Sequence, residues 1–282
     1  MPKDGGNLVL TAEERRKIIE DSPEAAPFIK RYIGANEFIN GLDRYCLWIE
    51  DEDLQKAKQI PWIVQRLRRV SKWRAESDAS STREYAAYPN RFKQKSYKPT
   101  DSIIVPSVSS ELRRYVPIGY LGADTVISNL AFAIYDAEPW LFALLTSRMH
   151  MAWLGTVGGK LETRYRYGAY IVYNNFPVPP LTDTLKQELT QRALRVLDVR
   201  EYHCEFTLAE LYDAEKMPDN LRKAHEDLDI AVDRIYRKGP FDSDEERLRL
   251  LFKLYRQMTD HEASAQQAAK PTRQSRRTRK VQ

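Results

Sequence analysis

The spacing of hydrophobic and polar residues divides the chain near residue 180. Before that point, short apolar segments alternate with glycine and proline, which is typical of strands joined by tight turns. Beyond it glycine nearly disappears and apolar residues recur every four positions, as on one face of a helix: Leu185, Leu189, Ala193 and Leu197. We therefore predict an α+β fold, in which a mixed, mostly antiparallel sheet domain with helices (residues 1–180) precedes a small all-α helical bundle (residues 181–262).

Within the first part, the capping-box pattern of Thr11 and Glu14 predicts a helix through Ile19. A helix over residues 54–74 is expected to break or kink at Pro61, with Arg66, Arg68, Arg69, Lys72 and Arg74 on its polar faces. A buried helix is expected to begin near Pro139. The predicted strands are bounded by turn-forming residues and cover 44–49, 102–105, 115–121, 125–128, 130–135, 160–166 and 169–173.

In the second part, three or four antiparallel helices are expected between residues 182 and 259. His225 falls beside an apolar stripe of this bundle, where a packing histidine is a simpler interpretation than a ligand. Residues 263–282 are expected to form a basic, disordered tail, since six Lys or Arg and no acid lie between Lys270 and Lys280.

Composition places the chain among globular proteins, because 42% of its residues are hydrophobic and 11% are aromatic. No apolar run reaches the roughly 18 residues of a membrane span, and the N-terminal residues lack the apolar core of a secretion signal. Cys46 and Cys204 are far apart in the sequence, which favours reduced thiols over a disulfide framework. We therefore expect a cytoplasmic protein with no membrane partner.

Positive charge is concentrated in one stretch, although the net charge is only +5. Between Arg66 and Lys98, ten Lys or Arg stand against three acids, with aromatic residues among them. This pattern favours a polyanion partner, whose phosphates are neutralised by cations while aromatics pack on sugars or splayed bases. The alternative is an extended surface loop pinned by its aromatics. The candidate contacts to a DNA backbone are Arg66, Arg69, Lys72, Arg83, Arg91, Lys93, Lys95 and Lys98.

The segment after Gly158 and Gly159 carries the most specific candidate chemistry. As a strand, it would direct four charged side chains to one face: Lys160, Glu162, Arg164 and Arg166. Glu162 and Arg164 would lie about 6.6 Å apart, close to the span of one base pair. In a major groove, the carboxylate could accept from cytosine N4 while the guanidinium donates to guanine O6 and N7. The alternative is a solvated strand face with a cross-strand ion pair.

Catalytic signatures are missing from the sequence. It has no glycine-rich nucleotide loop and no metal-binding spacing among its four histidines. His203 and Cys204 are neighbours on a predicted helix and point about 100° apart, so they do not form a nucleophile–base pair. These observations favour a chain that binds and positions a ligand, and we expect no cofactor, no metal and no catalytic residue in it.

Several short runs follow one another along the chain: RYCLW (44–48), PSVSSE (106–111), YVPIGY (115–120), SRMHMAW (147–153), GKL (159–161) and RY (166–167) with IVYNNFP (171–177). Together they resemble the target-recognition domain of MmeI-like (type IIL) restriction–modification enzymes and related adenine-specific DNA methyltransferases. Three further runs resemble the C-terminal helical domain of the same enzymes: LYD (211–213), MP (217–218) and LRKAHEDLD (221–229). The resemblance covers about residues 7–260.

The resemblance implies that the chain is the DNA-recognition half of a larger adenine-N6 DNA methyltransferase with a restriction endonuclease. Its partners would be double-stranded DNA and a separate methyltransferase/nuclease polypeptide. S-adenosylmethionine and Mg²⁺ would be bound only by domains that this chain lacks. In the family, the positions that match Glu162 and Arg164 read bases, as Glu-x-Arg or as Lys-x-Asp. The Glu-x-Arg of this chain is expected to select a C·G pair.

Other functions stay open on the sequence alone. The chain could be a fragment, a split subunit or a remnant of such an enzyme. It could instead be a stand-alone, non-enzymatic DNA-binding protein, such as a regulator or an antirestriction decoy. A third alternative is an RNA-binding protein that uses the basic, aromatic segment for splayed bases.

Overall fold

The computed structural model describes residues 2–93 and 97–269, which fold around two main hydrophobic cores. One core is built mainly from residues 8–92 and the other from residues 103–251, and we call these regions the N-terminal and C-terminal lobes. A smaller cluster that contains Ile33, Ile104 and Ile127 joins the sheets of the two lobes.

The N-terminal lobe is built on a four-stranded sheet with the order β1–β3–β2–β7. Its strands are β1 (Val9–Thr11), β2 (Ile29–Ile33), β3 (Arg44–Leu47) and β7 (Thr125–Ile127). All pairs are antiparallel except β2 with β7. The helices and 3₁₀ turns of this lobe are α1 (Ala12–Asp21), η1 (Pro23–Phe28), α2 (Ala35–Asn40), η2 (Asp51–Asp53), α3 (Leu54–Ala57), α4 (Pro61–Ala75), α5 (Ser80–Arg83) and η3 (Glu84–Ala87).

Local sequence signals set the helix boundaries of this lobe. The capping box of α1 is confirmed, because Thr11 Oγ1 accepts from the Glu14 N–H at 3.1 Å and Glu14 Oε2 accepts from the Thr11 N–H at 2.9 Å. Pro61 lies in the first turn of α4, so the helix predicted over residues 54–74 is two helices, α3 and α4. Proline is tolerated there because a first-turn N–H has no partner within its own helix.

Arg74 lies inside the N-terminal lobe, not on a polar face of α4 as predicted. Its side chain is fully buried. Position 74 follows Ile63, Leu67 and Val70 on one helical face, so the spacing itself explains the burial. Burial lowers the pKa of the guanidinium. The guanidinium donates to five backbone carbonyls, those of Pro2, Lys3, Tyr85, Tyr88 and Arg91.

The C-terminal lobe contains two three-stranded antiparallel sheets. One has the order β6–β4–β8, with β4 (Ser102–Pro106), β6 (Gly119–Leu121) and β8 (Ala131–Tyr135). The other has the order β5–β10–β9, with β5 (Val108–Ser109), β9 (Gly159–Leu161) and β10 (Arg164–Arg166). The mostly antiparallel sheet region is thus confirmed, although only the end of the strand predicted at 115–121 is extended.

Two predicted elements of this lobe differ in the structure. The helix that begins at Pro139 is divided into α6 (Pro139–Leu145) and α7 (Arg148–Val157), because Ser147 caps α7 by accepting from the His150 N–H. The strand predicted at 169–173 is a π-helical turn, η4 (Ala169–Tyr173). In η4 the fully buried Val172 accepts a hydrogen bond from Trp153 Nε1 at 3.1 Å, a tertiary contact that overrides the β propensity of this apolar run.

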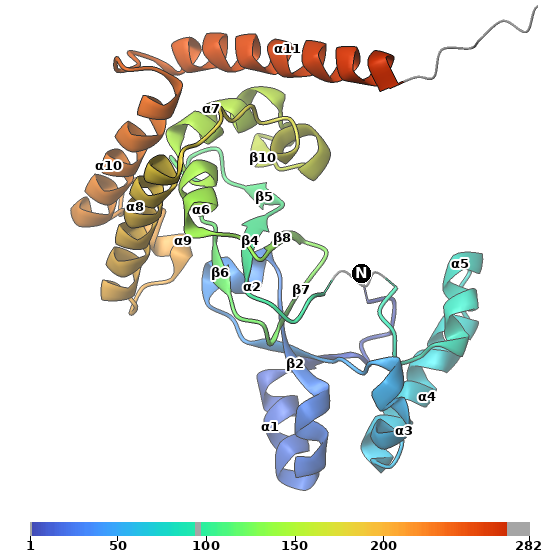
Figure 1. The fold of residues 1–282 in the computed structure, drawn as a ribbon. Coiled ribbons are helices and arrows are strands. Elements are labelled where there is room, and N and C mark those ends of the chain that lie inside the picture. Colours follow the sequence, from blue (N-terminus) through green and yellow to red (C-terminus); the bar gives the residue numbers. More distant parts are fainter. Residues whose placement is uncertain (1, 94–96, 270–282) are drawn as a thin grey trace, which may run out of the picture.

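The predicted helical bundle is confirmed. Its helices are α8 (Asp183–Tyr202), α9 (Leu208–Leu211), α10 (Asp219–Tyr236) and α11 (Asp244–Ala269). Figure 1 shows α8 beside α10, and α11 running above α7. Residues 263–269, predicted as the start of the tail, continue α11, and residues 270–282 lie outside the described residues. No helix in the described ranges has the length and apolar character needed to cross a bilayer.

The core of the C-terminal lobe is continuous across the domain boundary predicted at residue 180. Val172 and Phe176 on one side belong to the same buried cluster as Leu189 and Ala193 of α8. The helices therefore share one hydrophobic core with the sheet region.

A buried carboxylate connects the helices to the sheet region. Asp229 of α10 is only 8% exposed and accepts from the Tyr115 hydroxyl at 2.6 Å. It also accepts from the Arg148 N–H at 2.7 Å, where α7 begins and the helix dipole favours negative charge. Burial raises the pKa of Asp229 to about 6, although both hydrogen bonds lower it.

His225 lies beside this carboxylate and confirms the interpretation as a packing histidine. Its fully buried ring stacks on Tyr115 at a centroid distance of 4.2 Å, and its Nε2 lies 2.7 Å from the Tyr212 hydroxyl. That hydroxyl also accepts from Arg200 Nε at 2.6 Å, and Arg200 Nη1 donates to the Ile118 carbonyl at 2.6 Å. Burial lowers the pKa of His225 well below its ordinary value, so the ring is neutral.

The raised pKa of Asp229 has a measurable effect on stability. Between about pH 4 and 6 the folded protein holds a proton that the unfolded chain releases, so this group lowers the free energy of unfolding as pH rises. We expect the wild type to lose stability relative to Asp229→Asn by about 1–3 kcal/mol over this range, with no further change above it. Urea unfolding at a series of pH values measures the difference. Asp227→Asn, at the surface of the same helix, controls for charge, and a difference that does not vary with pH would contradict the expectation.

Candidate nucleic-acid interface

The charged segment after Gly158 is a hairpin, not the single strand predicted from the sequence. β9 pairs with β10 so that Leu161 lies opposite Arg164, which leaves Glu162 and Thr163 as the two turn residues. Glu162 has a φ of 58°, in the left-handed region that such turns use. Glycine or asparagine usually occupies a turn position with positive φ. Because neither is present at position 162, the alternation of charged residues predicts one continuous strand.

The turn brings Glu162 and Arg164 together at an exposed tip. Their carboxylate and guanidinium lie 2.7 Å apart, with 76% and 46% of the side chains exposed. The extended-strand arrangement predicted for this pair is therefore wrong, because Glu162 lies in the turn. Since an exposed ion pair is worth at most about 1 kcal/mol, it can open when a ligand offers better partners.

The other two predicted reading residues lie on opposite faces of the hairpin. Lys160 stands opposite Tyr165 and its Nζ lies 3.8 Å from the centre of that ring, so both side chains share one face. Arg164 and Arg166 alternate with Tyr165 along β10 and point to the other face. The single comb of four charges is thus corrected to Arg164 and Arg166 on one face and Lys160 on the other.

Three contacts fix the hairpin to the C-terminal lobe. β10 pairs with β5 along one side. At the tip, the Thr163 hydroxyl donates to the carboxylate of Glu111, which lowers the pKa of Glu111. At the base, the buried Tyr167 hydroxyl lies 2.9 Å from His150 Nε2. Burial lowers the pKa of His150 to about 3, so this ring is neutral.

The positioning residues of the hairpin have no signal in the local sequence. Glu111 is 52 residues from Thr163, and His150 is 17 residues from Tyr167. Only the fold brings these pairs together, which is why the sequence identified the charged residues but not their supports.

The described members of the predicted backbone-contact group lie in or beside the N-terminal lobe, away from the hairpin (Figure 1). Arg66 has an internal role: its side chain is 12% exposed, pairs with Glu14 and donates to the Asn7 carbonyl at 3.1 Å. Arg69 and Lys72 are exposed on α4. Lys95 lies outside the described residues.

The remaining cations of this group are held by neighbours. Arg91 forms two hydrogen bonds with Asp51, at 2.8 and 2.5 Å, and lies over the Tyr88 ring. The other contacts are Arg83 to the Ser77 and Asp78 carbonyls, Lys93 to Ser81 Oγ at 2.8 Å and Lys98 over the Tyr135 ring. The structure thus orders these cations without gathering them into one patch with the hairpin.

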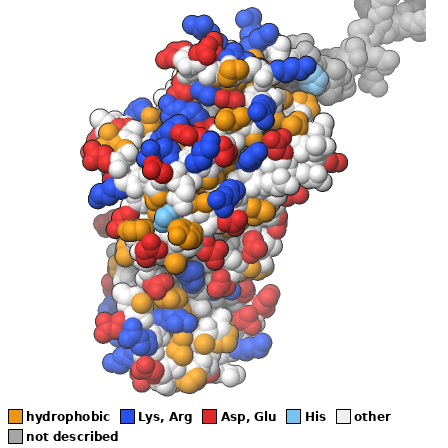
Figure 2. All heavy atoms as spheres, turned by 90° about the vertical axis from the view of Figure 1, so that its left-hand side faces the viewer, with side chains coloured by type: hydrophobic (Ala, Val, Ile, Leu, Met, Phe, Trp, Pro, Cys, Tyr) orange, Lys and Arg blue, Asp and Glu red, His pale blue; other side chains and the backbone are white. Residues whose placement is uncertain are grey.

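The face formed by the C-terminal helices is a weaker candidate. Figure 2 shows this side of the molecule, where Lys and Arg are interspersed with Asp and Glu. Its ion pairs include Lys223 with Asp227 and Arg222 with Asp219. Mixed charge of this kind gives no extended positive field for a polyanion.

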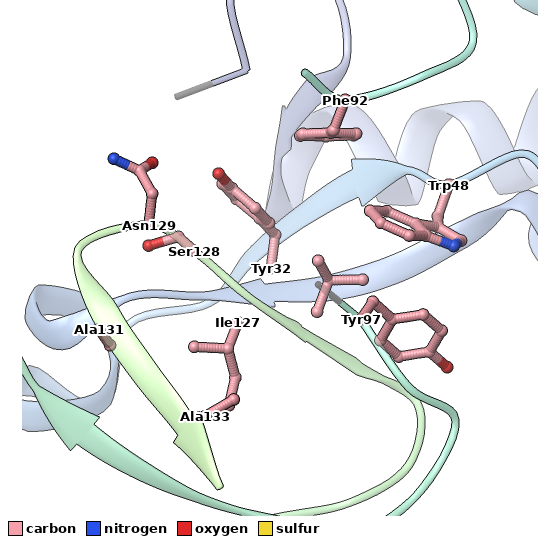
Figure 3. Close-up of a pocket in the computed structure, with 10 residues that line it drawn as sticks. Tyr32, Trp48, Phe92, Tyr97, Ile127, Ser128, Asn129, Ala131 and Ala133 are labelled. Atoms are coloured by element: carbon pink, nitrogen blue, oxygen red, sulfur yellow. The ribbon is translucent and has the colours of Figure 1, made fainter. Parts of the chain in front are cut away.

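An aromatic cavity of about 70 Å³ lies between the N-terminal sheet and the loop after β7. Figure 3 shows Trp48 and Tyr97 at one end and Ser128 and Asn129 at the other. The rings also pack on one another, with Trp48 and Phe92 stacked at 5.4 Å. The volume is well below the roughly 300 Å³ at which small-molecule sites begin, so the hairpin remains the better candidate. Within residues 2–93 and 97–269, no three His, Cys, Asp or Glu side chains gather as a metal site would require.

Comparison with known proteins gives two family matches. Residues 1–180 match the family model of the MmeI target recognition domain, and residues 181–262 match that of the MmeI C-terminal domain. The chain is 46% identical over 260 residues to DNA methyltransferase A of Bacillus subtilis (strain 168). The aligned region covers 92% of this chain and 30% of that protein.

A solved structure is also similar. It is the type IIL restriction–modification enzyme MmeI in complex with DNA, with a TM-score of 0.86 and 38% identity over 92% of this chain and 35% of that one. The chain therefore spans about a third of the length of these relatives.

Gly158, just before the hairpin, and Gly159, the first residue of β9, differ in the space available for a side chain, which gives a test. A Cβ at Gly158 would lie 2.4 Å from the Leu154 carbonyl oxygen, whereas at Gly159 the nearest atom, Arg166 Cβ, is 3.6 Å away. We expect Gly158→Ala to displace the hairpin and lower the free energy of unfolding by about 1–3 kcal/mol. Gly159→Ala is the matched control and should have a small effect. Equal effects in thermal unfolding would contradict this placement of the chain.

Proposed function

Because the chain belongs to the MmeI family, whose target recognition and C-terminal domains it carries, we propose that it reads a specific sequence in double-stranded DNA for an adenine-N6 DNA methyltransferase or restriction–modification enzyme. The observation that carries this proposal is the tip of the β9–β10 hairpin. It presents a carboxylate and a guanidinium side by side, exposed, on a turn that is fixed at its tip, side and base.

The tip matches the chemistry of one base pair in the major groove. Guanine offers O6 and N7 as acceptors and cytosine offers the N4 amino group as a donor. Arg164 can donate to guanine and Glu162 can accept from cytosine once their mutual ion pair opens. Because each charge moves from its partner to a base, neither is left unpaired when the duplex binds. The pair therefore selects C·G at one position.

The exposed cations of the N-terminal lobe supply the contacts that do not depend on sequence. Arg69 and Lys72 lie on one exposed stretch of α4, and Arg83, Lys93 and Lys98 follow along the chain. Contacts to phosphates position a protein on the duplex, while base contacts specify the sequence. Arg66 is left out of this group because it is bound inside the lobe.

The chemical step belongs to other parts of such an enzyme. We place S-adenosylmethionine and Mg²⁺ in a methyltransferase part and a nuclease part, which a longer chain or a separate polypeptide would supply. The assembly would act in the cytoplasm on cellular or invading DNA.

We expect Arg164→Ala to lower affinity for the preferred duplex by about 1–3 kcal/mol and to relax base choice at one position. The guanine contact is lost while the rest of the interface stays in place. Selection from a randomised duplex library identifies the site, and fluorescence anisotropy measures affinity. Arg195→Ala, which removes an exposed guanidinium from α8, is the matched control.

The double variant Glu162→Lys with Arg164→Asp gives the positive test. It should exchange the preferred C·G pair for G·C, because lysine then meets guanine and aspartate meets cytosine. Equal losses on every sequence, or tighter binding to single-stranded RNA than to any duplex, would refute the proposed function.

Removing the two α4 cations should weaken binding to all duplexes alike. We expect the double variant Arg69→Ala with Lys72→Ala to reduce the slope of log affinity against log salt by up to about 2, since each lost phosphate contact contributes about 0.9. The double variant Lys186→Ala with Arg195→Ala on α8 controls for net charge. An unchanged slope would remove α4 from the interface.

A further inference from the structure

Two apolar side chains next to the hairpin are exposed to solvent without an internal partner. Tyr170 and Ile171, in η4, are 83% and 59% exposed, and Tyr170 is the most exposed large hydrophobic residue among those described. No aromatic ring in the described residues stacks on Tyr170. Two neighbouring exposed apolar side chains beside a charged hairpin offer an apolar contact to a ligand.

The turn that carries these side chains is rigid. Val172 is fully buried and accepts from Trp153 Nε1, while the Gly168 and Ala169 carbonyls accept from the N–H groups of Val172 and Asn174 at 2.8 and 2.9 Å. The buried half of η4 therefore fixes the direction of its exposed half. When Tyr170 and Ile171 contact a ligand, little backbone entropy is lost, because the backbone of η4 is already fixed.

The position of η4 places these side chains beside the proposed reading hairpin. Figure 1 shows the coil of η4 next to β10. Tyr170 follows Arg164 by six positions, so their Cα atoms lie within about 21 Å, or about six base pairs along a duplex. Lys160 and Arg166, both exposed, add positive charge beside the ion pair of Arg164 with Glu162 at this end of the lobe, which complements a nucleic acid.

We propose that Tyr170 and Ile171 read the 5-methyl group of a thymine in the same groove, within about six base pairs of the C·G pair read by Glu162 and Arg164. The thymine methyl is the one apolar group that base pairs present in the major groove, and apolar side chains recognise it by contact. The inference rests on the proposed function and adds a second specificity element, which reads by apolar burial and not by charge.

The test replaces each thymine of the selected duplex by deoxyuridine, which lacks only the methyl group. For the wild type, one replacement within that window should weaken binding about fourfold, the effect of one buried methyl-sized group. Tyr170→Ser with Ile171→Ser should bind the thymine duplex correspondingly less tightly and should not respond to that replacement. Tyr202→Ser, which removes a similarly exposed tyrosine from the end of α8, is the matched control and should respond as the wild type does.

The outcomes separate this inference from the proposed function. If the wild type shows sequence preference that Arg164→Ala relaxes, but no deoxyuridine replacement matters, the methyl readout is refuted and the hairpin readout stands. The same holds if the double serine variant keeps the full response, or if the selected site shows no thymine preference in the window. If the wild type prefers no sequence at all, the proposed function itself fails.

Discussion

The carboxylate of Asp229 ties α10 to the first residue of α7, and this buried contact orients the part of the molecule that would meet a ligand. From that fixed start, α7 carries His150 to the base of the hairpin, where it meets the Tyr167 hydroxyl. Because the carboxylate is buried, its hydrogen bonds to Tyr115 and Arg148 have little competition from water. The C-terminal helices therefore act on the hairpin although they lie at the other side of the lobe.

This arrangement explains why two domains occur together in a recognition module. A side chain that selects a ligand by its hydrogen bonds must be held within a fraction of an ångström, and sites on rigid elements achieve this better than sites on free loops. The hairpin is short, so its own strands cannot hold it. Its stability comes from β5, from Glu111 and from α7, which is positioned by α10. The exposed ion pair of Glu162 and Arg164 can then change partners while the backbone stays in place.

In the N-terminal lobe, one buried side chain holds the irregular segments in place. Arg74 lies where the apolar stripe of α4 would place a hydrophobic residue, and its guanidinium binds the carbonyls of irregular segments at both ends of the lobe. A single side chain thereby satisfies backbone groups that have no sheet or helix partner. The chain that follows α5, from Tyr85 to Arg91, is held from inside by this contact.

The sequence by itself determined the α+β character, the capping box of α1, the helical bundle and the identity of the charged hairpin residues, because these follow from local periodicity and local hydrogen bonds. It could not determine that Glu162 begins a turn, that residues 169–173 form a π-helical turn or that Arg66 points inward. Those outcomes depend on partners distant in the sequence, such as Glu111, Trp153 and Glu14. Local propensities differ by about 1 kcal/mol or less, so such tertiary contacts decide between them.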